Sequence, residues 1–253
     1  MTEIAEGATA VGAEKPRSSE VHPGAGFRMR TSIQRPDHEV VHGLGEFATP
    51  DISDLMNRLY TMEVAIHNVT DPALRILGPA TTVKVYPGDN LMVHKALDVA
   101  RPGDVIVVDA GSTVMNAVLG DLISTKARHR GITGFVVDGL VRDIGAIREL
   151  GDFPVFARGV TPIGPLHRGP GEINYAISAG GIVVHPGDIV VGDVNGVVVV
   201  PRDVAPALLE DLRARAARES AYLEAVARGE FSNAWVDRAL DEADVRIWDG
   251  VGG

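Results

Sequence analysis

Charged side chains follow two segments that the sequence predicts as buried strands. The first strand leads on to Gly120 and Asp121, and the second leads to Arg142 and Asp143. In α/β sheets, ligands collect beyond the carboxyl ends of the strands. If the two strands are neighbours, Asp121, Arg142 and Asp143 are expected to meet in one crevice.

These residue types suit one kind of chemistry. A carboxylate at the start of a helix is a good ligand for a hard cation such as Mg²⁺ or Mn²⁺, so Asp143 is a candidate metal ligand. Arg142 can hold a carboxylate or an enolate oxygen through two parallel hydrogen bonds. Backbone N–H groups at the start of the helix near Gly120 can hold the other end of a small anion. A metal and a guanidinium together stabilise the enolate that forms when a carbon–carbon bond next to a pyruvoyl group breaks.

The elements that must position these residues alternate between strands and helices. Runs of Val and Ile indicate strands buried on both faces, and apolar residues at helical spacing indicate the helices between them. The sequence predicts strands over residues 80–85, 105–109 and 134–137, and helices over residues 53–60, 89–99, 116–130 and 143–150.

Later in the chain, the turn Pro102-Gly103-Asp104 returns as Pro186-Gly187-Asp188, each time before an apolar run. Asn195-Gly196 predicts a hairpin over residues 190–201. A long helix is expected over residues 203–228, ending at Gly229. The pattern indicates one α/β domain over residues 33–230 with a central mixed sheet and a C-terminal helix.

Two terminal segments flank this domain. Residues 1–32 are predicted to be a disordered tail, because the first two dozen residues are rich in Ala, Gly, Glu and Ser without a hydrophobic period. Residues 231–253 are predicted to be a tail that docks on the core or on a neighbouring subunit, since Trp235 and Trp248 lie in it.

Composition excludes several classes of function. The 253 residues contain no cysteine, so a disulfide, a thiolate nucleophile and a Cys-based zinc site are impossible, and a cytoplasmic location is expected. A net charge of −10 argues against nucleic-acid binding. No apolar run reaches the roughly 18 residues that span a bilayer, and no signal-peptide core is present.

The residues around the charged trio resemble the signature of a known family. The RraA-like family is indicated by Gly120-Asp121 followed by Gly131-x-x-Gly134-x-Val136-Val137-Asp138-Gly139-x-Val141-Arg142-Asp143. The resemblance covers roughly residues 45–230. The family includes 4-hydroxy-4-methyl-2-oxoglutarate / 4-carboxy-4-hydroxy-2-oxoadipate aldolases and the regulators of ribonuclease activity A.

The resemblance implies a layered α/β fold and a homotrimer or hexamer with its site between subunits. It implies a lyase that uses Mg²⁺ or Mn²⁺ to cleave 4-hydroxy-2-oxo acids to pyruvate, with oxaloacetate decarboxylase as a side activity. By resemblance, Asp143 binds the metal directly and Asp121 binds it through water. Arg142 binds substrate and stabilises the enolate, and the amides at Gly120, Leu122 and Ile123 contact the pyruvate carboxylate. Glu219 of an adjacent subunit, with Glu224 as the alternative, also binds metal-bound water.

Other interpretations remain open at this point. The chain could be a non-catalytic regulator that binds a ribonuclease or another protein. It could also be a metal-dependent hydratase or lactonase acting on a related oxo acid. His94 is expected on the surface. His38-Glu39-Val40-Val41-His42 matches a zinc-protease motif that works only on a helix, and Pro36 and Gly43 beside it argue against a helix there.

Overall fold

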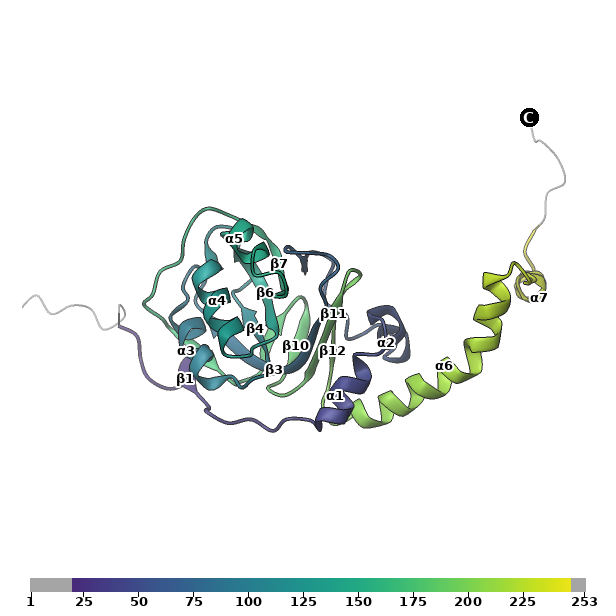
Figure 1. Ribbon diagram of the computed structural model, residues 1–253, viewed down its shortest axis with the longest axis horizontal. Helices are drawn as coiled ribbons and strands as arrows, with labels where there is room; N and C mark the ends of the chain where they lie inside the picture. The colour runs from purple at the N-terminus through teal and green to yellow at the C-terminus, as the bar shows by residue number, and fades with distance from the viewer. Residues whose placement is uncertain (1–19, 247–253) are drawn as a thin grey trace, which may run out of the picture. The chain divides into compact units, whose positions relative to one another are not determined.

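The computed structural model describes residues 20–246, which fall into two compact units that divide between Leu209 and Glu210. The elements of the chain are shown in Figure 1. In chain order they are β1 (Phe27–Met29), α1 (His38–Leu44), α2 (Thr49–Leu55), β2 (His67–Asn68), β3 (Ile76–Val85), α3 (Leu91–Val99), β4 (Val105–Asp109), β5 (Ala117–Leu119), α4 (Asp121–His129), β6 (Gly134–Val141), α5 (Ile144–Arg148), β7 (Val155–Val160), β8 (Gly171–Ile173), β9 (Ile177–Ala179), β10 (Ile182–Val184), β11 (Ile189–Asp193), β12 (Gly196–Val200), α6 (Ala205–Ala227) and α7 (Ala234–Glu242).

The first unit is built on a mixed sheet with the strand order β1-β8-β3-β4-β6-β7-β2. Strands β3, β4, β6 and β7 run parallel, and their register aligns Val83 with Val108 and Val108 with Val137. The hairpin β11–β12 joins the same sheet through β3. Because the central strands are parallel, their carboxyl ends share one edge, where the candidate residues were expected. The predicted α/β class with a central mixed sheet is therefore confirmed.

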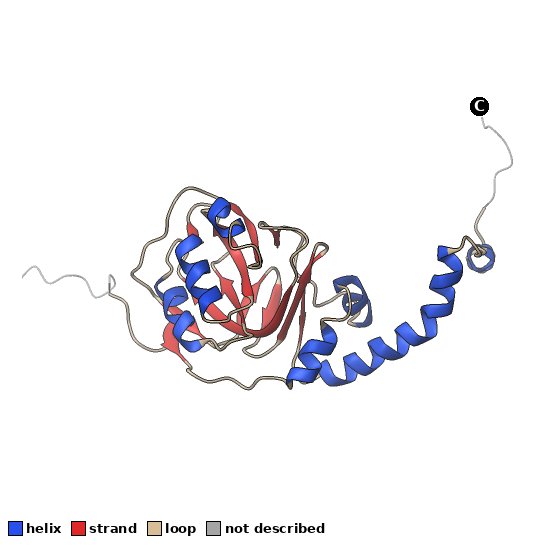
Figure 2. Cartoon of the chain, viewed as in Figure 1, coloured by secondary structure: helices blue, strands red, loops and turns tan. Residues whose placement is uncertain are grey.

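Each face of the sheet has its own core. In β4, Ile106 and Val108 pack with helices α3 and α4, whereas Val105 and Val107 pack with β9, β11 and β12. This alternation is the two-residue period of a strand, and both sets are fully buried. Helices cover the first of these faces in Figure 2.

Three expectations about local structure were wrong. The predicted helix over residues 116–130 begins instead with β5, which pairs with β6, because Ala117, Val118 and Leu119 are buried in the sheet. The predicted helix over 53–60 is replaced by α2, which starts earlier with a proline in its first turn and is followed by Asn57 and Arg58 at positive φ.

The third concerns the zinc-protease pattern, which does lie on a helix. Helix α1 spans His38–Leu44, and its two histidine rings stack with centroids 6.2 Å apart. Pro36 lies before the N-cap Asp37, where it does not interrupt the helix.

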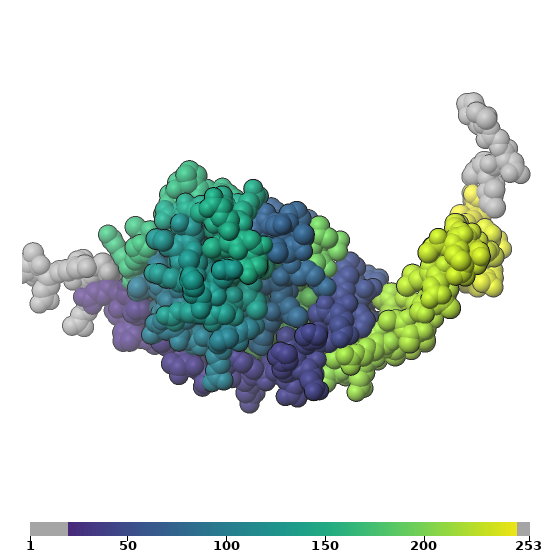
Figure 3. Space-filling view, viewed as in Figure 1, coloured from purple at the N-terminus to yellow at the C-terminus, as the bar shows by residue number. Residues whose placement is uncertain are grey.

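The N-terminal segment departs from the predicted tail. Residues 1–19 lie outside the described residues, but β1 pairs in parallel with β8, and Arg28 forms an ion pair with Glu172. The alternating residues Phe27 and Met29 are too few to give a hydrophobic period in the sequence. In the space-filling view the purple N-terminal residues lie along the surface of the first unit (Figure 3).

The second unit contains the later part of α6 and the whole of α7. No residue of α7 is buried, and Phe231 and Trp235 are each 59% exposed. Trp248 lies outside the described residues. Docking of this segment stays a prediction. Within the described residues, no helix combines the length and hydropathy that a membrane crossing requires.

Candidate active site

The first half of the candidate site is the junction of β5 and α4. Strand β5 ends at Leu119, and α4 begins at Asp121 with Gly120 as its N-cap. The amide and the hydroxyl of Ser124 both donate to the Gly120 carbonyl. The first amides of a helix have no partner within it, so the start of α4 offers N–H groups to an anion.

The second half is the turn after β6. Asp143 adopts φ 57° and ψ 34°, the left-handed region, which Asp tolerates better than most residues. The amide of Arg142 donates to the Leu119 carbonyl at 3.0 Å, and this bond ties the turn to the end of β5. Arg142 Nε lies 3.1 Å from Asp143 Oδ2, and each side chain is about 40% exposed. The strained turn thus presents a cation and an anion side by side.

Two glycines allow the Arg142 side chain to occupy its place. A Cβ on Gly120 would overlap Asp143 Oδ2 and come within 3.0 Å of Arg142 Cγ. A Cβ on Gly164 would lie 2.5 Å from Arg142 Nη1. The Arg142 side chain therefore packs against backbone at both Gly120 and Gly164.

A cavity of about 200 Å³ opens at this junction. It brings together five of the predicted site residues: Gly120, Asp121, Leu122, Ile123 and Arg142. Asp143 does not line the cavity but lies against Gly120. Glu219 belongs to the second unit, where Arg215 binds it at 3.0 Å, and its proposed part in a neighbouring subunit's site stays a prediction.

Another part of the cavity wall was not predicted from the sequence. It consists of Asn90, His94, Pro165 and His167. Asn90 is the N-cap of α3, and His94 follows it by four residues, so the helical period places both on one face of the helix. His94, which was predicted to lie on the surface, lines the cavity. Pro165 and His167 come from the irregular segment between β7 and β8, for which the sequence carries no periodic signal.

The two histidines of this wall interact. Their rings meet edge to face with centroids 5.6 Å apart, and His167 Nδ1 lies 2.5 Å from Asn90 Oδ1. Because the amide oxygen only accepts, Nδ1 of His167 carries the proton. Burial lowers the pKa of His94, and the nearby His167 and Lys126 lower that pKa further. His94 is thus kept neutral near pH 7.

Asp109 and Asp138 are used in structural contacts. Asp138 forms an ion pair with Arg158 and accepts hydrogen bonds from Ser112 and the Gly180 amide. Asp109 pairs with Lys84 at 3.2 Å. Both carboxylates are therefore engaged in contacts within the first unit and do not line the cavity.

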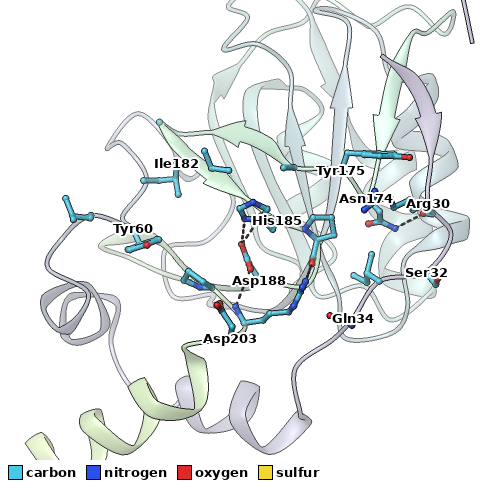
Figure 4. Close-up of a pocket in the computed structure, with 18 residues that line it drawn as sticks. Arg30, Ser32, Gln34, Tyr60, Asn174, Tyr175, Ile182, His185, Asp188 and Asp203 are labelled. Atoms are coloured by element: carbon cyan, nitrogen blue, oxygen red, sulfur yellow. Dashed lines mark hydrogen bonds and ion pairs between the residues drawn. The ribbon is translucent and has the colours of Figure 1, made fainter. Parts of the chain in front are cut away.

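A larger cavity, of about 1170 Å³, lies elsewhere on the first unit (Figure 4). It shares no lining residue with the cavity at Arg142. Arg30 and Asn174 lie on one side of it and Tyr60 on the other (Figure 4). Its buried carboxylate, Asp188, already accepts from the backbone amides of His185 and Arg202. None of the residues predicted to form the site lines this cavity.

The donor groups near Arg142 suit a hard cation that keeps much of its water. Within residues 20–246 no three His, Asp or Glu side chains are grouped closely enough to form a metal site on their own. Asp143 and Asp121 offer oxygen atoms only. One or two carboxylates completed by water and substrate are typical of Mg²⁺, whereas zinc favours three or four nitrogen or sulfur ligands.

Comparisons with known proteins point to one family. A model of the RraA-like group, described as Aldolase/RraA, matches residues 49–199. A protein of Halalkalibacterium halodurans, named "Putative 4-hydroxy-4-methyl-2-oxoglutarate aldolase", is 41% identical over 178 residues, which are 70% of this chain and 84% of that protein. A Pseudomonas aeruginosa protein of the same name is 33% identical over 62% of this chain and 95% of its own length.

Solved structures agree with this likeness. Streptomyces coelicolor RraAS2, described as an unusual member of the RNase ES inhibitor RraA family, superposes with a TM-score of 0.66 at 28% identity, covering 75% of this chain and 98% of its own. The RNA-processing inhibitor RraA of Thermus thermophilis gives a TM-score of 0.56 at 30% identity, over 61% of this chain and 93% of its own.

Proposed function

The chain belongs to the RraA-like family, and from that premise we propose that it is a divalent-metal-dependent pyruvate aldolase. It cleaves 4-hydroxy-2-oxo acids of the 4-hydroxy-4-methyl-2-oxoglutarate type. The observation that carries the proposal is the Arg142 guanidinium, held between Gly120 and Gly164 beside a cavity that Asp121 and the start of α4 also line.

The proposed reaction is a retro-aldol cleavage. A base takes the proton of the 4-hydroxyl, and C4 becomes the carbonyl carbon of the second product as the bond between C3 and C4 breaks. The electron pair of that bond forms the C2–C3 double bond, and the C2 carbonyl pair moves onto its oxygen to give the pyruvate enolate. Arg142 donates hydrogen bonds to that oxygen as its negative charge grows. The amides at the start of α4, near Leu122 and Ile123, hold the C1 carboxylate. Protonation at C3 then gives pyruvate.

In this proposal Asp143 would hold a divalent cation, Mg²⁺ or Mn²⁺, directly, and Asp121 would hold it through water. Glu219 of a neighbouring subunit in a homotrimer or hexamer is the third contact. When bound, the cation supplies positive charge that favours the enolate. Decarboxylation of oxaloacetate needs the same enolate, so we expect it as a side activity.

The test is pyruvate release from oxaloacetate and from 4-hydroxy-4-methyl-2-oxoglutarate, measured with Mg²⁺, with Mn²⁺ and with a chelator. We expect metal-dependent release that falls about 100-fold or more in Arg142→Ala, because one donor to a developing oxyanion is lost. Arg128→Ala is the matched control, since Arg128 forms an exposed ion pair with Asp152 away from the cavity.

The result that contradicts the proposal is no release from either substrate by a folded oligomer that binds the cation. That outcome would favour the regulator interpretation, in which the chain binds a ribonuclease. The likeness to the two RraA structures makes this the next function to test.

A further inference from the structure

The tripeptide Pro-Gly-Asp occurs a third time, at residues 87–89. All three copies form the same turn. Gly88, Gly103 and Gly187 have φ values of 79°, 89° and 90°. In each copy the aspartate amide donates to the carbonyl three residues earlier, at 2.9 to 3.1 Å. All three aspartates are at least 97% buried.

The three carboxylates are used differently. Asp104 accepts from the amide of Arg101, and Asp188 from the amide of His185, so both bind their own turn. At the third turn the corresponding amide, of Tyr86, donates to the Pro170 carbonyl instead. The carboxylate of Asp89 is thereby free to bind elsewhere.

Asp89 binds the segment of residues 161–170, which we call the strap. Its Oδ2 accepts from the Arg168 amide at 2.5 Å and its Oδ1 from the Gly169 amide at 3.0 Å. The Leu91 amide donates to Oδ1 as well, at 2.8 Å. Three N–H groups on one buried carboxylate fix the strap against the start of α3.

Further bonds continue along the strap. The Leu166 amide donates to the Gly88 carbonyl at 2.8 Å, and the Leu166 carbonyl accepts from the Asn90 amide at 2.9 Å. Asn116 donates to the Gly164 carbonyl at 2.9 Å. These hydrogen bonds hold the strap against the rest of the first unit along its length.

The other side of the strap faces the candidate site. Gly164 lies against Arg142 Nη1, and Pro165 and His167 line the cavity. We infer that Asp89 is a positioning residue, which sets the place of the Arg142 guanidinium through the strap. The effect on catalysis rests on the proposed function, but the effect on the Arg142 side chain does not.

The test uses Asp89→Asn, which keeps the size of the side chain but turns one acceptor oxygen into an NH₂ group that faces an N–H. We expect the Nε–H resonance of Arg142, identified by its loss in Arg142→Ala, to shift or broaden. Affinity for oxalate, a planar mimic of pyruvate enolate, should fall about 10-fold or more, because a small displacement of the Arg142 guanidinium weakens its hydrogen bonds to the ligand. In the Arg142→Ala background, Asp89→Asn should have no further effect on oxalate affinity.

Asp188→Asn is the matched control, because it weakens the same kind of turn away from the strap. It should leave the Arg142 resonance and oxalate affinity unchanged. If Asp89→Asn does not fold, Gly164→Ala tests the same contact, since its Cβ pushes on Nη1 from the strap side. Amide exchange of residues 161–170 should rise in Asp89→Asn and stay as in wild type in the control.

The inference is overturned if the Arg142 resonance and the strap amides in Asp89→Asn match those of wild type. It is also overturned if Asp89→Asn weakens oxalate binding equally with and without Arg142, because that pattern indicates a general loss of structure. Failure of the proposed function gives a different result: no pyruvate release by the wild type, whatever Asp89→Asn does to the Arg142 resonance.

Discussion

The turns at residues 102–104 and 87–89 have the same sequence and backbone but hold different parts of the chain. Asp104 accepts from its own turn, from Thr81 and from the guanidinium of Arg35, which binds both of its oxygens at 2.9 and 2.7 Å. Asp89 accepts from three backbone amides, two of them in the strap. The first turn supports the fold and the second supports the candidate site. The tripeptide determines the local geometry, while residues far along the chain determine what the carboxylate binds.

The largest effect that this comparison predicts is on stability. Asp104→Asn leaves the half-buried guanidinium of Arg35 without its charge partner, and breaking such a pair costs about 3 kcal/mol of unfolding free energy. Urea unfolding measures it. Asp188→Asn should cost less, because Asp188 has no guanidinium bound to both oxygens. If Asp104→Asn and Asp188→Asn lower the unfolding free energy equally, the claim that Arg35 gives the turn at residues 102–104 a special part in stability is wrong.

A smaller effect separates the glycines of the two turns. Gly103→Ala meets no atom within 4 Å, so it should cost only the strain of a positive φ, about 1–2 kcal/mol. Gly88→Ala adds contacts of 3.1 to 3.2 Å with Asn116, which holds Gly164 of the strap. We expect Gly88→Ala to lower pyruvate release as well as stability, and Gly103→Ala to lower stability alone. Equal rates of pyruvate release by Gly88→Ala and Gly103→Ala at equal stability would contradict the inference that the turn at residues 87–89 positions the candidate site.

The smallest effect concerns pH and a carboxylate outside the three turns. Burial alone would raise the pKa of Asp193, but hydrogen bonds from Thr49 and Asn195 outweigh it and lower the pKa. A lowered folded-state pKa means stability that is present above the unfolded value of about 3.9 and lost as the pH falls through the folded value. Asp193→Asn should therefore flatten the pH dependence of unfolding below about pH 4. The pKa of Asp152 is also lowered, by its exposed ion pair with Arg128, but solvent screens that pair, so Asp152→Asn should change the pH dependence less than Asp193→Asn does.

Much of the fold followed from apolar patterning. Strand β4 has the predicted bounds, and the hairpin at Asn195-Gly196 forms as expected, because each is determined by local sequence. The errors arose where the tertiary environment decides. Ala117 and Leu119 are good helix formers, but burial beside β6 makes this segment a strand.

The candidate site was predictable on one side only. Asp121 and Arg142 meet because the carboxyl ends of neighbouring parallel strands share an edge, which is a general rule. His167 and Pro165 reach the cavity from the strap, whose path is fixed by Asp89, 80 residues from Gly169. A single sequence contains no periodic pattern that links such distant positions. The roles of the predicted residues remain predictions.

The pairing of β1 with β8 has a consequence for biosynthesis. Arg28 and its partner Glu172 are 144 residues apart, and among residues 20–246 no strand other than β8 pairs with β1. At roughly 5–20 residues per second, a ribosome adds the partner strand about 7 to 30 s after β1. Strand β1 is thus made long before its partner, and a nascent chain that stalls before β8 should leave this segment open to proteases and chaperones.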